Sequence, residues 1–344
     1  MIEGWDYIGW QGITVCVPKG WDPVVIGGTW DSGYLQIADS TTIRMEIKWK
    51  RVKGEVNLPL ILDRFISEIK QRAAKKKSYV EVERDAKLID RKKVLEKKGA
   101  LTFSWESIAK AYGVVYQCPE CKRVIIAQVI SHREDPNALK LASWILTRME
   151  DHPDGDLALW SAYGFSARIP KGYMLVSHEI KSGYIRLAFE GRKTELLLLR
   201  WSLANIILEK TNIKEWYVAN FKGRRKKERP RFEVREWSDG PHDLVLIEGR
   251  KWRPIDRIGY RIEKLLSLEG KYFIWGKAWH CRESNKIYAV ELLGGEKARG
   301  ILDLVSEGIT CHVWEEEDKD NEGADARGKA EKKAWGRGGG DGRR

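Results

Sequence analysis

An internal repeat constrains the fold of this 344-residue chain more than any other feature. Residues 12–21, GITVCVPKGW, match residues 164–173, GFSARIPKGY, and both segments alternate apolar and polar residues before a Pro-Lys-Gly-aromatic turn. Two strand-like matches follow in the same order, 32–37 with 182–187 and 45–49 with 197–201. Ordered matches at a nearly constant offset predict two tandem copies of one unit.

The remainder of each copy supports the same interpretation. Apolar residues at helical spacing predict a helix over 58–77, followed by strands and then a closing helix. The later segments of the two copies correspond as follows: helix 58–77 with helix 202–221, strand 118–125 with 281–288, and closing helix 136–149 with 296–306. We therefore expect an α+β fold, a tandem duplication of an antiparallel β-sheet unit with flanking helices.

The predicted boundaries follow from composition. Residues 151–156, DHPDGD, are turn-rich and separate a first repeat unit, 1–153, from a second, 154–314. Residues 315–344 are acidic at first, then basic and Gly-rich, a composition that cannot bury a core. We expect this tail to be disordered.

Each copy resembles the PsbP-like fold family. The resemblance lies in the strand and turn 169–173, IPKGY, the strand 270–275, GKYFIW, the strand 286–290, KIYAV, and a closing helix. It implies a curved antiparallel sheet with flanking helices and a binding scaffold without a shared active site. No functional residue carries over from it.

Composition narrows the cellular setting. No apolar run approaches the roughly 20 residues that a membrane-spanning helix needs, and the N-terminus does not resemble a secretory signal. We expect a cytoplasmic protein. Lys, Arg and Glu are abundant while Met occurs only four times, a bias that suggests a thermophilic source.

The cysteines suggest two alternatives to simple burial. Cys118 and Cys121 form a C-x-x-C motif, which is half of a zinc ribbon, but no second such motif exists. In the second copy Cys118 corresponds to Cys281 whereas Cys121 corresponds to Ser284, which favours a buried core role for the shared cysteine. We assign no metal ligand. Pairs 280–281 (His-Cys) and 311–312 (Cys-His) leave a Cys281–Cys311 disulfide open.

Catalytic motifs are absent from the sequence. None of the nucleophile-elbow, zincin, P-loop or dinucleotide-binding patterns occurs. Residues 293–296, LGGE, precede a helix and fit a strand-to-helix turn better than an anion site. We assign no catalytic residue and no cofactor, and an enzyme with an unrecognised site remains the less favoured alternative.

Basic residues supply the main functional hypothesis. The chain carries +12 overall, and residues 315–344 contain nine acidic and eight basic side chains, so +13 belongs to the rest. Residues 222–231 read as an exposed basic loop, and a second basic segment ends the first predicted helix. If the two copies pack with pseudo-two-fold symmetry, these segments would form one phosphate-binding surface. The alternative is that the charges are solvated and only keep the protein soluble. The candidate nucleic-acid-binding residues are Arg224, Arg225, Lys226, Lys227, Arg229, Lys75, Lys76 and Lys77.

Aromatic residues and the tail complete the hypothesis. Most of the 16 Trp residues lie on shared strands and are expected in the core, whereas Trp237 and Trp252 are candidates for a contact surface. The Arg/Gly-rich tail either follows a nucleic-acid backbone or acts as a solubilising extension. The predicted function is a non-catalytic binding or scaffold protein that engages nucleic acid or a ribonucleoprotein, with a protein–protein adaptor as the alternative.

Overall fold

The computed structural model describes residues 4–88, 99–252, 259 and 270–312 of the chain. Residues Met1 to Cys311 form one compact unit. The predicted tail, 315–344, lies outside the described residues. No helix among the described residues is long and apolar enough to cross a membrane.

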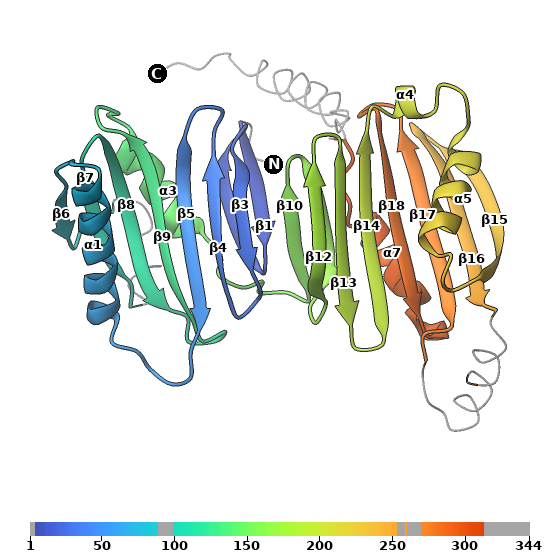
Figure 1. The fold of residues 1–344 in the computed structure, drawn as a ribbon, viewed down its shortest axis with the longest axis horizontal. Coiled ribbons are helices and arrows are strands. Elements are labelled where there is room, and N and C mark those ends of the chain that lie inside the picture. Colours follow the sequence, from blue (N-terminus) through green and yellow to red (C-terminus); the bar gives the residue numbers. More distant parts are fainter. Residues whose placement is uncertain (1–3, 89–98, 253–258, 260–269, 313–344) are drawn as a thin grey trace, which may run out of the picture. The chain divides into compact units, whose positions relative to one another are not determined.

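The two repeats have the same order of strands and main helices, and the second adds the short helices α4 and η1 (Figure 1). The first repeat contains β1 (Trp5–Trp10), β2 (Ile13–Pro18), β3 (Asp22–Gly28), β4 (Ser32–Ala38), β5 (Ile43–Arg51), α1 (Leu58–Lys75), β6 (Glu81–Arg84), β7 (Leu101–Glu106), β8 (Ala109–Gln117), β9 (Arg123–His132) and α3 (Ala138–Arg148). The second contains β10 (Leu157–Ala162), β11 (Phe165–Pro170), β12 (Met174–Lys181), β13 (Tyr184–Gly191), β14 (Thr194–Ser202), α4 (Ala204–Ile207), α5 (Ile213–Arg224), β15 (Pro230–Asp239), β16 (His242–Lys251), β17 (Phe273–Cys281), β18 (Lys286–Gly294), η1 (Glu296–Ala298) and α7 (Arg299–Glu307).

Each repeat builds an antiparallel seven-stranded sheet. The strand order is β3-β4-β5-β9-β8-β7-β6 in the first and β12-β13-β14-β18-β17-β16-β15 in the second. At each position of the two sheets, the strand of the first repeat and the strand of the second are equivalent. The predicted α+β duplication is confirmed.

A third sheet joins the repeats. Its order is β11-β10-β1-β2, and its central strands β1 and β10 are antiparallel with Gly9 opposite Ser161. These two residues are repeat equivalents, because the matching segments 12–21 and 164–173 set the same offset. Equivalent residues face each other only where a two-fold axis passes, so the repeats are related by pseudo-two-fold symmetry through this pair. A Cβ on Gly9 would lie 2.5 Å from the carbonyl oxygen of Leu159, so the close approach requires glycine.

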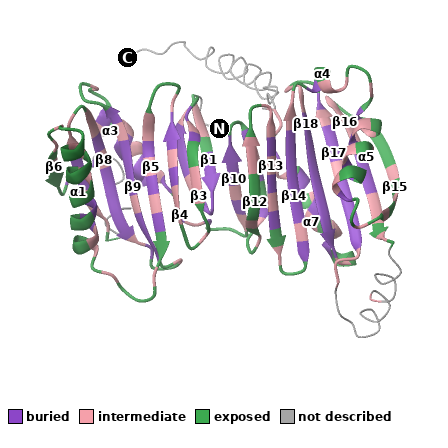
Figure 2. Cartoon of the chain, viewed as in Figure 1, coloured by how far each residue is buried: buried purple, intermediate pink, exposed green. Residues whose placement is uncertain are grey.

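Three apolar clusters fill the layers. The largest contains residues of both repeats and lies on the side of each sheet that the β1–β2 and β10–β11 hairpins, α3 and α7 cover. Smaller clusters lie under α1 in the first repeat and α5 in the second. Strand β18 is therefore covered on both faces, which explains its nearly continuous apolar sequence, whereas the edge strand β15 is mostly exposed (Figure 2).

Helices α1 and α5 begin at asparagine caps. The side chain of Asn57 accepts a hydrogen bond from the backbone N–H of Leu60, and that of Asn212 accepts one from Glu215, both at 2.9 Å. The second cap explains a difference from the sequence expectation. The predicted helix 202–221 is two helices, α4 and α5, because the chain restarts at Asn212.

Two repeat matches are displaced. The match of 32–37 with 182–187 is wrong by two residues, because Gly33 pairs with Trp49 whereas Ile185 pairs with the equivalent Arg200. The match of 45–49 is displaced by one residue. Trp49 pairs with Ile125, whereas the residue that pairs with the equivalent Tyr288 is Arg200 and not Trp201. A register shift between Ile37 and Ala38 has no counterpart between β13 and β14, so the alignment of 45–49 with 197–201 is wrong by one position. Trp201 consequently points to the opposite face and packs edge-on against Trp216 of α5.

Candidate functional site

The predicted nucleic-acid-binding residues fall into two groups. Six are exposed at the ends of α1 and α5. These are Lys75, Lys76, Lys77, Lys226, Lys227 and Arg229. Figure 1 shows the two helices over different seven-stranded sheets, so these cations do not gather on one surface. The proposed interface stays a prediction, in the form of two separate patches.

The other two residues, Arg224 and Arg225, bind a buried carboxylate. Glu291 of β18 is fully buried, and its Oε1 accepts hydrogen bonds from Arg224 Nε at 2.8 Å and Nη2 at 2.5 Å. Its Oε2 lies 3.3 Å from Arg225 Nε, and Arg225 is itself only 7% exposed. The pairs form because α5 continues through Arg224, where the sequence suggested a loop. Two guanidinium groups thus bind one buried acid and attach the end of α5 to the sheet.

The first repeat has a different polar centre at the corresponding place. Gln128 of β9, the equivalent of Glu291, donates to Glu46 Oε2 at 2.7 Å and accepts from the Trp105 indole at 2.9 Å. Gln36 Nε2 also donates to Glu46, at 2.6 Å. The carboxylate here bonds to neighbouring strands, and no group of α1 takes part in the bonds found among the described residues.

A hollow of about 380 Å³ lies next to the ion pairs of the second repeat. Val176 and Ser177 of β12 line one side, and Arg224 and Arg225 line the other. Between them Arg186 Nη1 donates to Ser177 Oγ at 2.9 Å. The hollow therefore connects the edge of the sheet with the charged end of α5.

A group of four side chains with metal-binding chemistry lies at the turn between β8 and β9. Cys118 and Cys121 of the turn meet Asp151 and His152, which follow α3, and one ligand atom of each lies within 4.8 Å of the others. The Sγ of Cys118 is 3.5 Å from His152 Nδ1, and the Sγ of Cys121 is 3.4 Å from Asp151 Oδ2. Asp151, in the predicted interdomain linker, is only 2% exposed.

Hydrogen bonds fix the orientation of this group, named here the first cluster. His152 Nε2 lies 2.9 Å from Glu120 Oε2, which leaves Nδ1 directed at Cys118 and Asp151. Tyr116 donates its hydroxyl to Asp151 Oδ1 at 3.2 Å. Burial, reinforced by Asp151, raises the pKa of Cys118 to about 12. Two thiols and a buried carboxylate thus share one site.

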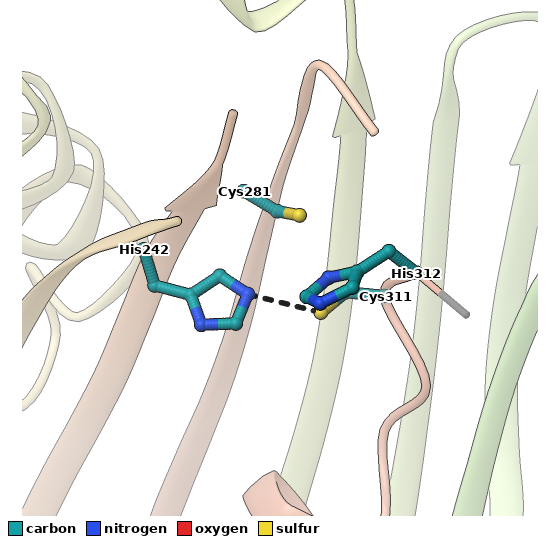
Figure 3. Close-up of side chains that lie close together, drawn as sticks. All are labelled: His242, Cys281, Cys311 and His312. Carbon is teal, nitrogen blue, oxygen red and sulfur yellow. Dashed lines mark hydrogen bonds between the residues drawn. The ribbon is translucent and has the colours of Figure 1, made fainter. Parts of the chain in front are cut away.

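A second cluster lies where β16 begins and β17 ends (Figure 3). It consists of His242, Cys281, Cys311 and the next residue, His312, again with one ligand atom of each within 4.8 Å of the others. His242 Nε2 lies 3.2 Å from the Sγ of Cys311. Burial raises the pKa of Cys311 to about 11, and the neighbouring Cys281 adds to the effect. Cys281 and Cys311 are not joined by a disulfide bond in this structure.

The sequence interpretation placed some of these residues and missed others. Cys118 and Cys281 are both buried, as expected for a shared core cysteine. His242 was not anticipated, and the pairing of Cys121 with Asp151 and His152 was hidden because these residues were assigned to a linker. The position of two dipeptides in the sequence could have indicated these sites. Asp151-His152 and Cys311-His312 each follow the closing helix of their repeat. Each also comes directly after a residue in an isolated β-bridge, Glu150 with Thr14 in the first repeat and Thr310 with Ser166 in the second.

The remaining predicted features are distributed over the surface and core. Residues 293–296 form the strand-to-helix turn, with η1 beginning at Glu296. Trp21, Trp49 and Trp275 are buried as expected. Trp237 is 41% exposed on β15, and Trp252 is 38% exposed with the Arg231 guanidinium 3.7 Å from its ring centre. Their role as a contact surface stays a prediction.

Comparisons with known proteins give little beyond the fold described above. No family model and no curated protein sequence matches the chain. Among solved structures, the immunity protein TplEi of the type VI secretion system of Pseudomonas aeruginosa matches in complex with its "L" peptide, with a TM-score of 0.31 and 10% identity, over 90% of this chain and 98% of that one. The same protein without peptide gives a TM-score of 0.30 and 10% identity, over 90% and 97%. Similarity at this level carries no argument about function.

Proposed function

We propose that this chain is a non-catalytic binding protein that captures an extended segment of a protein partner at strand β12. The observation that supports the proposal is the exposed apolar edge of the second sheet. β12 is an end strand, and Met174 and Val176 on it are 65% and 57% exposed. An end strand presents backbone N–H and C=O groups that an added strand can pair with.

The two sheet edges differ in how well they are protected. β3, the equivalent edge of the first repeat, carries Pro23, which has no N–H to donate. Both strands have a register shift at the same point, between Pro23 and Val25 and between Leu175 and Ser177. β12 has no proline, and the hollow beside Val176 can receive a side chain of the added strand. We therefore favour β12 over β3.

Recovery of bound partners from the native cell tests this function. Wild-type protein should retain a defined protein partner after nuclease treatment and at high salt, because backbone pairing and apolar contact are weakly screened. Val176→Lys should reduce recovery at least about tenfold, because a lysine at a sheet edge opposes strand addition. Ile108→Lys is the matched control, since Ile108 is 85% exposed in the first repeat and away from β12. Equal recovery with Val176→Lys would contradict the proposal.

Nucleic-acid binding is the second candidate function, supported by the six exposed cations. Its signature is affinity that falls steeply with salt, with a slope proportional to the number of phosphates contacted. Replacing Lys226 and Lys227 by Glu should then reduce that slope by about 2. Loss of all partners on nuclease treatment would favour this candidate over strand addition.

A further inference from the structure

We propose that the first and second clusters are two structural zinc sites, one in each repeat. The sites occupy equivalent positions. Each draws on the turn of a β-hairpin, through Cys118 or its equivalent Cys281, and on the segment that follows the closing helix. The proposal is independent of the strand-addition function.

The composition of each group suits zinc. The first cluster offers two sulfurs, one imidazole nitrogen and one carboxylate oxygen, and the second offers two sulfurs and two imidazoles. Zinc in structural sites takes four such ligands, and two Cys with two His is a common set. Four protein ligands leave no position open for water, so the sites would stabilise the fold and would not catalyse a reaction.

The spacing of the ligand atoms fits a tetrahedron. With bonds of about 2.3 Å to sulfur and about 2.0–2.1 Å to nitrogen, a tetrahedral zinc gives sulfur–nitrogen edges of ~3.5 Å. The Cys118 Sγ to His152 Nδ1 distance is 3.5 Å, and the His242 Nε2 to Cys311 Sγ distance is 3.2 Å.

The surroundings of the first cluster also suit a cation. Asp151 is a buried carboxylate next to two thiols, and His152 Nδ1 lies 3.0 Å from its Oδ2. Glu120 accepts from the outer nitrogen of His152, and Tyr116 donates to the outer oxygen of Asp151. Such second contacts orient the ligating atoms in zinc sites. On binding, both thiols would release their protons to solvent and the thiolates would bind the ion.

The duplicated position explains why the sequence hid these sites. Both copies have a cysteine at the first position, Cys118 and Cys281, but the second copy has Ser284 where the first has Cys121. In the second cluster His242, on the neighbouring strand β16, occupies the place that Cys121 supplies in the first. Aligning the two copies therefore suggests that the second copy lacks the ligand that Cys121 supplies. The structure shows that His242, from another strand, supplies a ligand in its place.

Zinc stoichiometry of the full chain tests the proposal. The protein is purified under reducing conditions, loaded with Zn²⁺, freed of unbound metal, and its zinc content is measured by elemental analysis. We expect two equivalents per chain, and one after Cys118→Ser with Cys121→Ser or after Cys281→Ser with Cys311→Ser. Cys16→Ser is the control, because Cys16 is a buried thiol outside both clusters, and it should retain two. Fewer than two equivalents in the wild type, or two in either paired variant, would overturn the proposal.

A surface variant guards against misfolding of the cysteine variants. Glu120 is 77% exposed in its side chain, so Glu120→Gln should leave the fold intact. Competition with a chromogenic chelator should show zinc held about 10–100-fold more weakly at one site and unchanged at the other. Glu134→Gln, an exposed glutamate beyond the opposite end of β9, should change neither affinity. If Glu120→Gln also changes neither, the proposed geometry of the first site is wrong.

Discussion

The two repeats treat the same buried position of their sheets in different ways. In the first, Gln128 and Glu46 belong to neighbouring strands and satisfy each other within the sheet. In the second, Glu291 is bound by two arginines at the end of α5. The sheet is similar in both copies, but only in the second does a buried charge hold the helix. Duplication has preserved a polar position while changing what that position binds.

The largest expected effect comes from removing the buried acid of the second repeat. Glu291→Ala removes the buried carboxylate that Arg224 and Arg225 share and leaves Arg225 only the longer contact with Glu228, at 3.7 Å, which should lower the free energy of unfolding by about 3–5 kcal/mol. Denaturant titration measures the loss. Glu307→Ala, an exposed acid at the end of α7, should have little effect and serves as the control.

A smaller loss is expected from the equivalent change in the first repeat. Gln128→Ala removes one partner each from Glu46 and the Trp105 indole, and should cost about 1–3 kcal/mol. Gln71→Ala, on the exposed face of α1, provides the matched control. The contrast between the repeats would be refuted if Gln128→Ala destabilised the protein more than Glu291→Ala.

The smallest effect concerns the turn between β4 and β5. Burial alone would raise the pKa of Asp39, but hydrogen bonds from Thr41, Thr42 and Arg44 outweigh it and hold the pKa below its ordinary value. The corresponding turn of the second repeat, 191–194 (GRKT), has no carboxylate. Asp39→Asn should cost about 1 kcal/mol at neutral pH.

The sign of the pH dependence follows from the lowered pKa. The contribution of Asp39 is complete above the unfolded-state pKa of about 3.9 and is lost as the pH falls toward the lower folded-state value. Unfolding free energies of wild type and Asp39→Asn should therefore differ at pH 7 and converge at low pH. A difference that stays constant with pH would show that the charge of Asp39 contributes nothing.

The sequence predicted what depends on local pattern. Alternation before the Pro-Lys-Gly turns located β2 and β11, and apolar spacing located α1, α3 and α7. It failed where partners are distant: Arg224 and Arg225 looked like solvent-exposed cations because Glu291 lies on a strand far along the chain. The one-residue error at Trp49 has a different cause: the extra residue Arg44 in β5 shifts the register and leaves no signature in the composition.

The candidate sites were harder still to predict from the sequence. Neither the edge exposure of β12 nor the meeting of His242 with Cys311 follows from any segment alone, because both depend on which strand ends a sheet and which strand neighbours it. The cysteines themselves were noticed. Their partners could be found only from the path of the chain after each closing helix.

The pairing of Gly9 with Ser161 has a consequence for how such a chain could arise. In a chain of one repeat, the outer edge of β1 would be open, and the same antiparallel pairing would join two separate molecules with Gly9 facing its own copy. The two repeats therefore pair as the subunits of such a homodimer would. In a single chain each half can change independently of the other. For this reason an acid bound by arginines in one half can coexist with an amide at the same position of the other half.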